Sequence, residues 1–119
     1  MSPGPGSPLR PVARRPAAER DIAEAAAYYA LQGGLTLELD FIDALEASFD
    51  LIARHPASGS TRHSLLLPQL PTPLRFHRLK RFDRYLVYYL DLPTNVEVIR
   101  VWDASRGLEA LIQDTGPSD

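Results

Sequence analysis

The sequence predicts an α+β fold in which a helical hairpin packs on a small antiparallel β-sheet. Two amphipathic runs between residues 16 and 55 are separated by a pair of glycines, which favours two antiparallel helices. Three further runs begin at residue 74: the first alternates imperfectly and the second is dense in β-branched and aromatic residues, which favours strands joined by turns. A chain of 119 residues with 45% hydrophobic composition has room for one domain and one modest core. The expected order is β-α-α-β-β-β, with a candidate short C-terminal helix.

The N-terminal segment divides into two parts. Residues 1–8 are rich in proline and glycine and lack the basic-then-apolar layout of a signal peptide, so we expect a flexible leader. Over residues 9–14 the apolar set Leu9, Pro11 and Ala13 alternates with Arg10, Val12 and Arg14, which indicates a short strand. Pro11 would restrict that strand to a sheet edge or to a first position.

Two helices are expected next. Pro16 suits the first helical position, and the apolar spacing continues to about residue 31, where Gly33 and Gly34 end the run. The second helix stops at the His-Pro pair of residues 55–56. Its apolar residues step by four, four and three: Phe41, Leu45, Phe49 and Ile52.

The C-terminal half is expected to supply the sheet. Residues 64–73 are apolar and contain three prolines, so we expect a loop that lies on the core without regular structure. The strands are expected at 74–82, 85–90 and 96–102, with turns at 82–84 and 92–95. The middle strand is apolar throughout, as a strand buried on both faces would be. A short helix at 108–113 completes a single domain over residues 9–113, and residues 114–119 are expected to form a tail.

Charge is unevenly distributed along the chain. Residues 16–53 hold eight acidic side chains and one basic one, whereas residues 54–106 hold nine basic and four acidic ones. Such an asymmetry suggests that different faces meet different partners, although acidic helices and basic strands also simply keep a small protein in solution.

Several function classes are excluded by composition. The chain has no cysteine, so neither disulfides nor thiolate chemistry is available. Its three histidines do not have the spacing of metal ligands, and we expect no metal and no cofactor. No apolar run is long enough for a bilayer span, so we expect a cytoplasmic protein without a membrane partner.

The strand expected at 74–82 and the turn that follows it are strongly basic. Five cations fall within ten residues: Arg75, Arg78, Lys80, Arg81 and Arg84. Such a density suits phosphate or an acidic protein surface, and a plain solvated strand is the alternative. A nuclease would also need two proton carriers, for which His77 with Glu97 or Asp103 are the candidates. The sequence does not place these groups together, so we expect no catalytic residue.

The aromatic residues allow two interpretations. Tyr28 lies on the first helix, Tyr85 on the middle strand and Trp102 at the end of the last strand. Core packing is the default for such side chains, and contact with a partner helix is the alternative.

The ordered set of features resembles the RelE/ParE toxin superfamily over residues 12–111. The first half is carried by residues 18–22, the Tyr-Tyr pair at 28–29, the second helix at 41–52 and the segment 55–59. The second half is carried by Leu74 and Arg75, then 84–89, 96–101 and Arg106. RelE-like members carry a catalytic Tyr or His after the last strand, whereas here no Tyr or His follows Trp102. The chain therefore looks like the ParE branch.

The resemblance implies a function. ParE-like toxins of type II toxin–antitoxin systems poison DNA gyrase without being enzymes, and a ParD-like antitoxin binds them in a hetero-oligomer. Two alternatives stay open: a RelE-like ribosome-dependent mRNA endonuclease, and a degenerate member that only binds its antitoxin. Direct binding of nucleic acid is left open as well. In the ParE branch a His often follows the last strand, whereas here residues 103–107 read Asp-Ala-Ser-Arg-Gly.

The expected site residues fall into two sets. An amphipathic antitoxin helix would fill an apolar groove beside the aromatic strands, and arginines would pair with its acidic residues. The antitoxin-binding candidates are Tyr28, Tyr85 and Trp102. The target-contact candidates are Arg75, Arg78, Lys80, Arg81, Arg84, Arg100 and Arg106.

Overall fold

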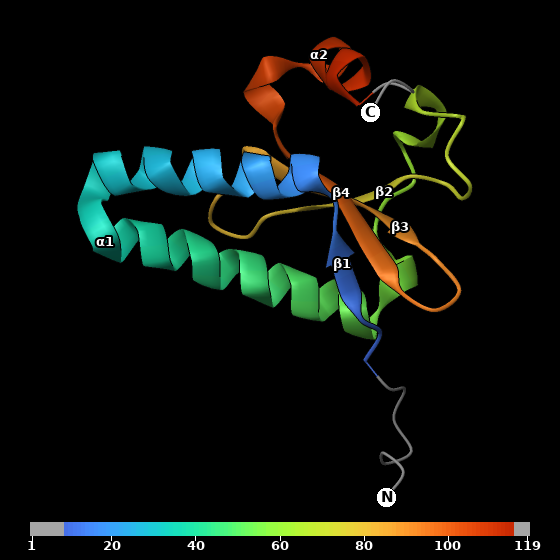
Figure 1. Ribbon diagram of the computed structural model, residues 1–119, viewed down its shortest axis with the longest axis horizontal. Helices are drawn as coiled ribbons and strands as arrows, with labels where there is room; N and C mark the ends of the chain where they lie inside the picture. Colours follow the sequence, from blue (N-terminus) through green and yellow to red (C-terminus); the bar gives the residue numbers. More distant parts are fainter. Residues whose placement is uncertain (1–8, 116–119) are drawn as a thin grey trace, which may run out of the picture.

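The computed structural model describes residues 9–115, so the expected leader at 1–8 and residues 116–119 of the expected tail lie outside the described residues. The elements are β1 (Val12–Arg14), α1 (Pro16–Arg54), β2 (Arg75–Arg78), β3 (Tyr85–Asp91), β4 (Val96–Asp103) and α2 (Leu108–Asp114). Short 3-10 turns lie at Pro56–Ser58, Ser64–Leu66 and Ala104–Arg106. The predicted α+β order is therefore confirmed (Figure 1).

The helix α1 is a hairpin. Its backbone leaves the helical conformation at Gly33 and Gly34, and Gly34 has a φ of 73° that favours glycine. The two arms, residues 16–32 and 35–54, run antiparallel and extend well beyond the sheet (Figure 1). The glycine pair thus ends the first helix and reverses the chain, as predicted.

The sheet has the strand order β1-β4-β3-β2. β2, β3 and β4 form the predicted antiparallel run, and β1 joins β4 in parallel, with Val12 opposite Val96. The parallel pairing was not indicated by the sequence pattern. β1 also begins at Val12 rather than at residue 9, because Pro11 cannot donate to the ladder and offers only its carbonyl, which accepts from Val96 N at 2.9 Å. β1 occupies a sheet edge, as Pro11 predicted.

Two further boundaries differ from the prediction. β2 ends at Arg78, well before residue 82, because Arg81 adopts a left-handed φ of 71° that an extended strand excludes. The turn that follows is closed by a hydrogen bond from Tyr85 N to Phe82 O, at 2.9 Å. Residues Ser64–Leu66 form a 3-10 turn where we expected no regular structure. The loop nevertheless lies on the core, since Leu67 is buried.

The sheet is covered on both faces. One face packs against the hairpin through a cluster that includes Tyr29, Phe41, Leu45, Val87 and Val98. The opposite face is covered by the 64–73 loop and by α2, through Leu67 and Leu111. The middle strand is consequently buried at every position from 85 to 90, as predicted. The aromatic strands therefore do not form the floor of a wide open groove.

Two further findings concern residues 9–115 only. None of the helices in this range combines the length and the apolar character needed to cross a bilayer. The same range holds no group of three or more His, Cys, Asp or Glu side chains arranged to hold a metal ion.

Candidate functional site

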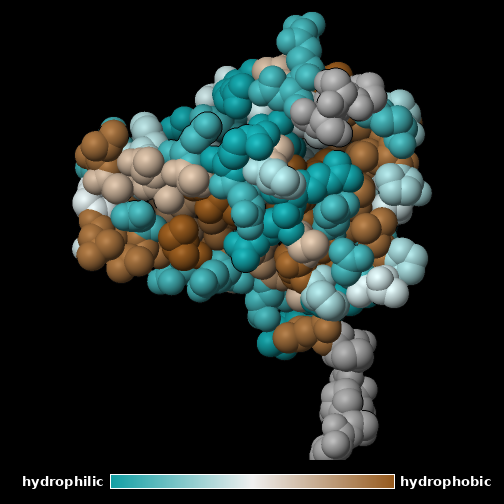
Figure 2. Space-filling view, viewed as in Figure 1, coloured by the Kyte–Doolittle hydropathy of each residue, from teal (hydrophilic) through white to brown (hydrophobic). Residues whose placement is uncertain are grey.

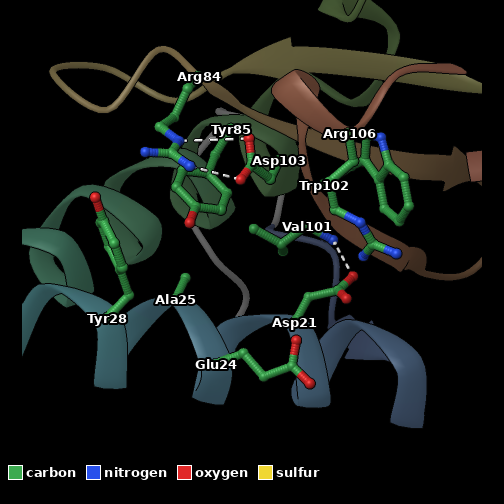
Figure 3. Close-up of a pocket in the computed structure, with 10 residues that line it drawn as sticks. All are labelled: Asp21, Glu24, Ala25, Tyr28, Arg84, Tyr85, Val101, Trp102, Asp103 and Arg106. Carbon is green, nitrogen blue, oxygen red and sulfur yellow. Dashed lines mark hydrogen bonds and ion pairs between the residues drawn. The ribbon is translucent and has the colours of Figure 1, made fainter. Parts of the chain in front are cut away.

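A hollow of about 220 Å³ lies between the first arm of α1 and the C-terminal end of β4 (Figure 3). We call it the α1–β4 hollow. It is lined by Asp21, Glu24, Ala25, Tyr28, Arg84, Tyr85, Val101, Trp102, Asp103 and Arg106. The hollow thus brings together all three predicted antitoxin-binding residues and two of the predicted target-contact cations.

One side of the hollow is formed by a guanidinium held over aromatic rings. Arg84 Nη2 donates to Asp103 Oδ2 at 2.7 Å, and the Arg84 Cζ lies 5.3 Å from the ring centroid of Tyr28. Ser105 N donates to Asp103 Oδ1 at 3.0 Å. Burial alone would raise the pKa of the Asp103 carboxyl, but the hydrogen bonds from Arg84 and Ser105 lower it below its usual value. The carboxylate therefore stays ionised and fixes the orientation of Arg84.

The other side of the hollow is formed around Trp102. Two guanidinium groups lie over the indole, with Arg106 Cζ at 4.2 Å and Arg100 Cζ at 4.8 Å from the ring centroid. Trp102 Nε1 donates to Gly107 O at 3.2 Å, and Arg106 Nη2 pairs with Asp114 Oδ2 at 2.9 Å. Only 1% of Trp102 is exposed, and Tyr85 is also buried. Both residues are core side chains that a partner could reach only through the hollow.

Arg100 forms a buried ion pair with Asp21. Its Nε and Nη2 donate to the two carboxylate oxygens of Asp21, both at 2.8 Å, and Val101 N donates to Asp21 Oδ2 at 3.0 Å. Its Nη1 donates to Thr115 Oγ1 at 3.0 Å. Arg100 is 6% exposed, so this predicted target-contact residue lies inside the protein and ties α1, β4 and the C-terminal segment together.

The remaining predicted cations fall into two places. Arg75 lies at the β2 edge and donates to Ala57 O at 2.8 Å and Gly59 O at 3.0 Å, while Arg78 donates to Asp83 O at 2.9 Å. Lys80 and Arg81 instead lie beside the second arm of α1, where Arg81 Nη2 is 3.6 Å from Asp40 Oδ2. The seven cations therefore do not form one continuous surface.

The candidate proton carriers are separated from one another. His77 Nε2 lies 2.8 Å from Ser58 Oγ, and its ring stacks on Tyr89. Glu97 pairs with Arg15, and Asp103 pairs with Arg84 in the hollow. Each group is thus occupied in a different part of the molecule.

Sequence reasoning missed Arg62 and His63. The His63 ring stacks on Phe76 at 4.5 Å, and its Nδ1 lies 2.8 Å from the Tyr88 hydroxyl. A β-bridge between Ser60 and Phe76 brings this loop to the edge of β2. The loop and the strand are more than ten residues apart in the sequence, and neither a motif nor a periodicity connects them. The contact is therefore visible only in the folded chain, through the Ser60–Phe76 bridge.

An apolar patch covers the end of the hairpin and adjoins the hollow (Figure 2). Leu31 is 87% exposed, Leu35 is 68% exposed and Leu39 is 50% exposed. Tyr28, which lines the hollow, is 40% exposed and connects the two features. Exposed apolar side chains that gather on one part of a surface are a feature of protein-interaction sites.

Comparison with known proteins gives consistent results. Residues 12–108 match the family described as the ParE toxin of the type II toxin–antitoxin system parDE. Among solved structures, the chain is similar to one described as the chromosomal ParDE TA system from P. aeruginosa, with a TM-score of 0.62 and 14% identity. That alignment covers 78% of this chain and 94% of the other, and it supports the fold. No curated protein sequence matches this chain.

Proposed function

Because this chain belongs to the ParE toxin family of type II toxin–antitoxin systems, we propose that it is a toxin that inhibits DNA gyrase without enzymatic turnover. A ParD-like antitoxin keeps it silent in a cytoplasmic hetero-oligomer. The family match over residues 12–108, which spans nearly the whole proposed domain at 9–113, is the observation that carries the proposal.

The α1–β4 hollow and the hairpin end support antitoxin binding. An amphipathic helix needs an apolar surface for one face and complementary charge for its flanks. The exposed leucines 31, 35 and 39 offer the apolar surface, and Tyr28 continues that surface into the hollow. Arg84 and Arg106 at the hollow offer complementary charge to acidic antitoxin residues.

The positions of the proton carriers support a non-enzymatic mode of action. Metal-free RNA cleavage needs an acid and a base within reach of one phosphate. The Ser58–His77 contact, the Arg15–Glu97 pair and the Arg84–Asp103 pair each occupy one candidate in a separate place. The toxin would then act by holding its target.

Purified protein added to DNA gyrase tests the target. We expect loss of supercoiling or accumulation of cleaved DNA as toxin is added, and relief of both by a ParD-like antitoxin. Unaffected gyrase at large molar excess of toxin would reject the proposal. A translation extract is the parallel assay: cleaved message there would favour the ribosome-dependent endonuclease. Normal growth on expression without antitoxin would favour a member that only binds its antitoxin.

Two charged substitutions on the hairpin end test the antitoxin surface. Leu31→Glu and Leu35→Glu should each weaken binding of a ParD-like antitoxin at least tenfold, because a carboxylate replaces an apolar contact. Leu65→Glu is the matched control, since Leu65 is 87% exposed but lies in the loop after the hairpin. Binding that is equally weak in the control would argue against this surface. The thermal unfolding of all three variants should match that of the parent.

A further inference from the structure

The cations of this protein differ in whether a carboxylate neutralises them. All thirteen Lys and Arg side chains lie within residues 9–115, and eight of them have a carboxylate oxygen within 4.0 Å. Those eight are Arg10, Arg14, Arg15, Arg54, Arg81, Arg84, Arg100 and Arg106. Among the described residues, the other five have no such partner: Arg20, Arg62, Arg75, Arg78 and Lys80. Of these, Arg62, Arg75 and Arg78 lie at the outer edge of β2.

These three arginines and His63 lie around the outer edge of β2, on both faces of the strand, and we call this feature the β2-edge patch. Arg78 follows Phe76 by two residues in β2, so both side chains point to the same face of the sheet, and His63 stacks on Phe76. Burial lowers the pKa of His63, and the charges of Arg62 and Arg78 lower it further. Arg75 extends the patch along the strand, on the face opposite Arg78.

The patch is polar as well as basic. The loop that forms its outer margin reads Ser-Gly-Ser-Thr-Arg-His-Ser over residues 58–64, and Ser58, Ser60 and Thr61 are exposed. Phosphate groups of nucleic acids are contacted by arginine, by serine and threonine hydroxyls and by backbone N–H groups. Protein interfaces, in contrast, are built around an apolar centre. The exposed leucines 31, 35 and 39 lie elsewhere, on the hairpin end, and Leu65 is the exposed leucine nearest the patch in the sequence.

We propose that the β2-edge patch is a binding site for the phosphodiester backbone of nucleic acid, with Arg62, Arg75 and Arg78 as its phosphate contacts. Guanidinium groups suit phosphate because they can donate two parallel hydrogen bonds to it. A backbone contact of this kind does not read the base sequence. The inference concerns the free protein, so it holds or fails whether or not gyrase is the target.

Fluorescence anisotropy of the purified full chain tests the site, with a labelled 20-base-pair duplex DNA and a labelled 20-nucleotide single-stranded RNA as the two probes. Each lost phosphate contact should weaken binding to duplex DNA about eightfold at 0.1 M salt, and should reduce the slope of log K against log salt by about 0.9. The test variants are Arg62→Gln and Arg78→Gln. Arg62 is the cleaner position, because Arg78 also donates to the turn at Asp83.

Arg20→Gln is the matched control. Arg20 also lacks a carboxylate partner among the described residues, but it lies on α1 beside Asp21 and Glu24, away from β2. The substitution changes the net charge equally. We expect it to leave binding within about twofold of the parent, because it removes no phosphate contact.

The outcomes are distinguishable. Binding of either probe that is weakened by the two edge variants and retained by Arg20→Gln supports the site, and the tighter probe identifies its source as DNA or RNA. Equal weakening by Arg20→Gln would show a non-specific effect of net charge and would overturn the proposal. Absence of binding of both probes at 50 mM salt would overturn it too. Binding of a poly-glutamate peptide without binding of either nucleic-acid probe would also overturn the proposal, because the ligand would then be an acidic protein segment.

Discussion

The arginines in and beside the α1–β4 hollow and those of the β2-edge patch behave as two different kinds of residue. Arg84, Arg100 and Arg106 each have a carboxylate partner within 2.9 Å. Arg75 and Arg78 donate instead to main-chain carbonyls, and no carboxylate of residues 9–115 pairs with them. The same side chain thus fixes the fold in one region and offers charge to a partner in the other, and neighbouring residues decide which.

Burial accounts for the pairing of Arg100, which is 6% exposed, whereas Arg84 and Arg106 are paired although they are exposed. A guanidinium that is removed from water must be paired and hydrogen-bonded, so a buried arginine requires a carboxylate. An exposed arginine stays hydrated, and a surface ion pair adds only about 0–1 kcal/mol, so exposed positions can remain unpaired. Substitutions in the two regions should therefore separate effects on stability from effects on binding.

The largest effect should come from the buried pair. Arg100→Leu leaves the Asp21 carboxylate buried without its main partner, and we expect the free energy of unfolding to fall by about 3–5 kcal/mol. Urea denaturation followed by circular dichroism measures it. The double variant Arg100→Leu/Asp21→Leu removes both charges and should recover much of the loss. A single variant as stable as the parent would show that the pair does not stabilise the fold.

A substitution at the edge of β2 should have an intermediate effect. A Cβ on Gly59 would lie 2.4 Å from Tyr89 Oη, which itself accepts from Gly59 N at 2.8 Å. We expect Gly59→Ala to lower the free energy of unfolding by about 1–3 kcal/mol, because the loop must move to relieve the overlap. Thermal denaturation measures the change, and Thr61→Ala in the same exposed loop is the control. An unchanged melting temperature in Gly59→Ala would contradict the tight fit.

The two regions should also respond to acid at different pH values. Burial lowers the pKa of both His63 and His77 below 6.5, so the unfolded chain binds more protons and stability falls as the pH drops below about 6.5. In the hollow, the lowered pKa of Asp103 stabilises the fold above about pH 3.8 and loses that effect only below it. Melting temperatures between pH 7.5 and 3 test this, and His63→Gln with His77→Gln should flatten the decline near pH 6.

The smallest effect on stability should come from Arg62→Gln. The side chain is exposed, and an exposed substitution away from buried contacts changes the free energy of unfolding by at most about 0.5 kcal/mol. The same variant should weaken binding of duplex DNA about eightfold at 0.1 M salt, so stability and function separate at this position. A loss of stability comparable to that of Arg100→Leu would erase the distinction between the two regions.

The arrangement of secondary structure could be predicted because its signals are local. Pro16, the glycine pair at 33–34 and the apolar steps of the second arm determine the hairpin within their own neighbourhood. The middle strand could be recognised from its apolar run, and its burial on both faces followed from the same run. Boundaries were less accurate: the end of β2 depends on the left-handed conformation of Arg81, a residue type without a local preference for it.

The sequence alone therefore determined the α+β order, the hairpin, the basic character of the first antiparallel strand and the family resemblance. Tertiary structure decided which cations are available: Arg100 is neutralised by Asp21, and Arg62 joins Arg78 only through the Ser60–Phe76 bridge. The reason is that a charge is compensated by whatever lies within a few ångströms in space, irrespective of separation along the chain. The arginine-rich strand was readable from its sequence, but the loop that completes its surface was not.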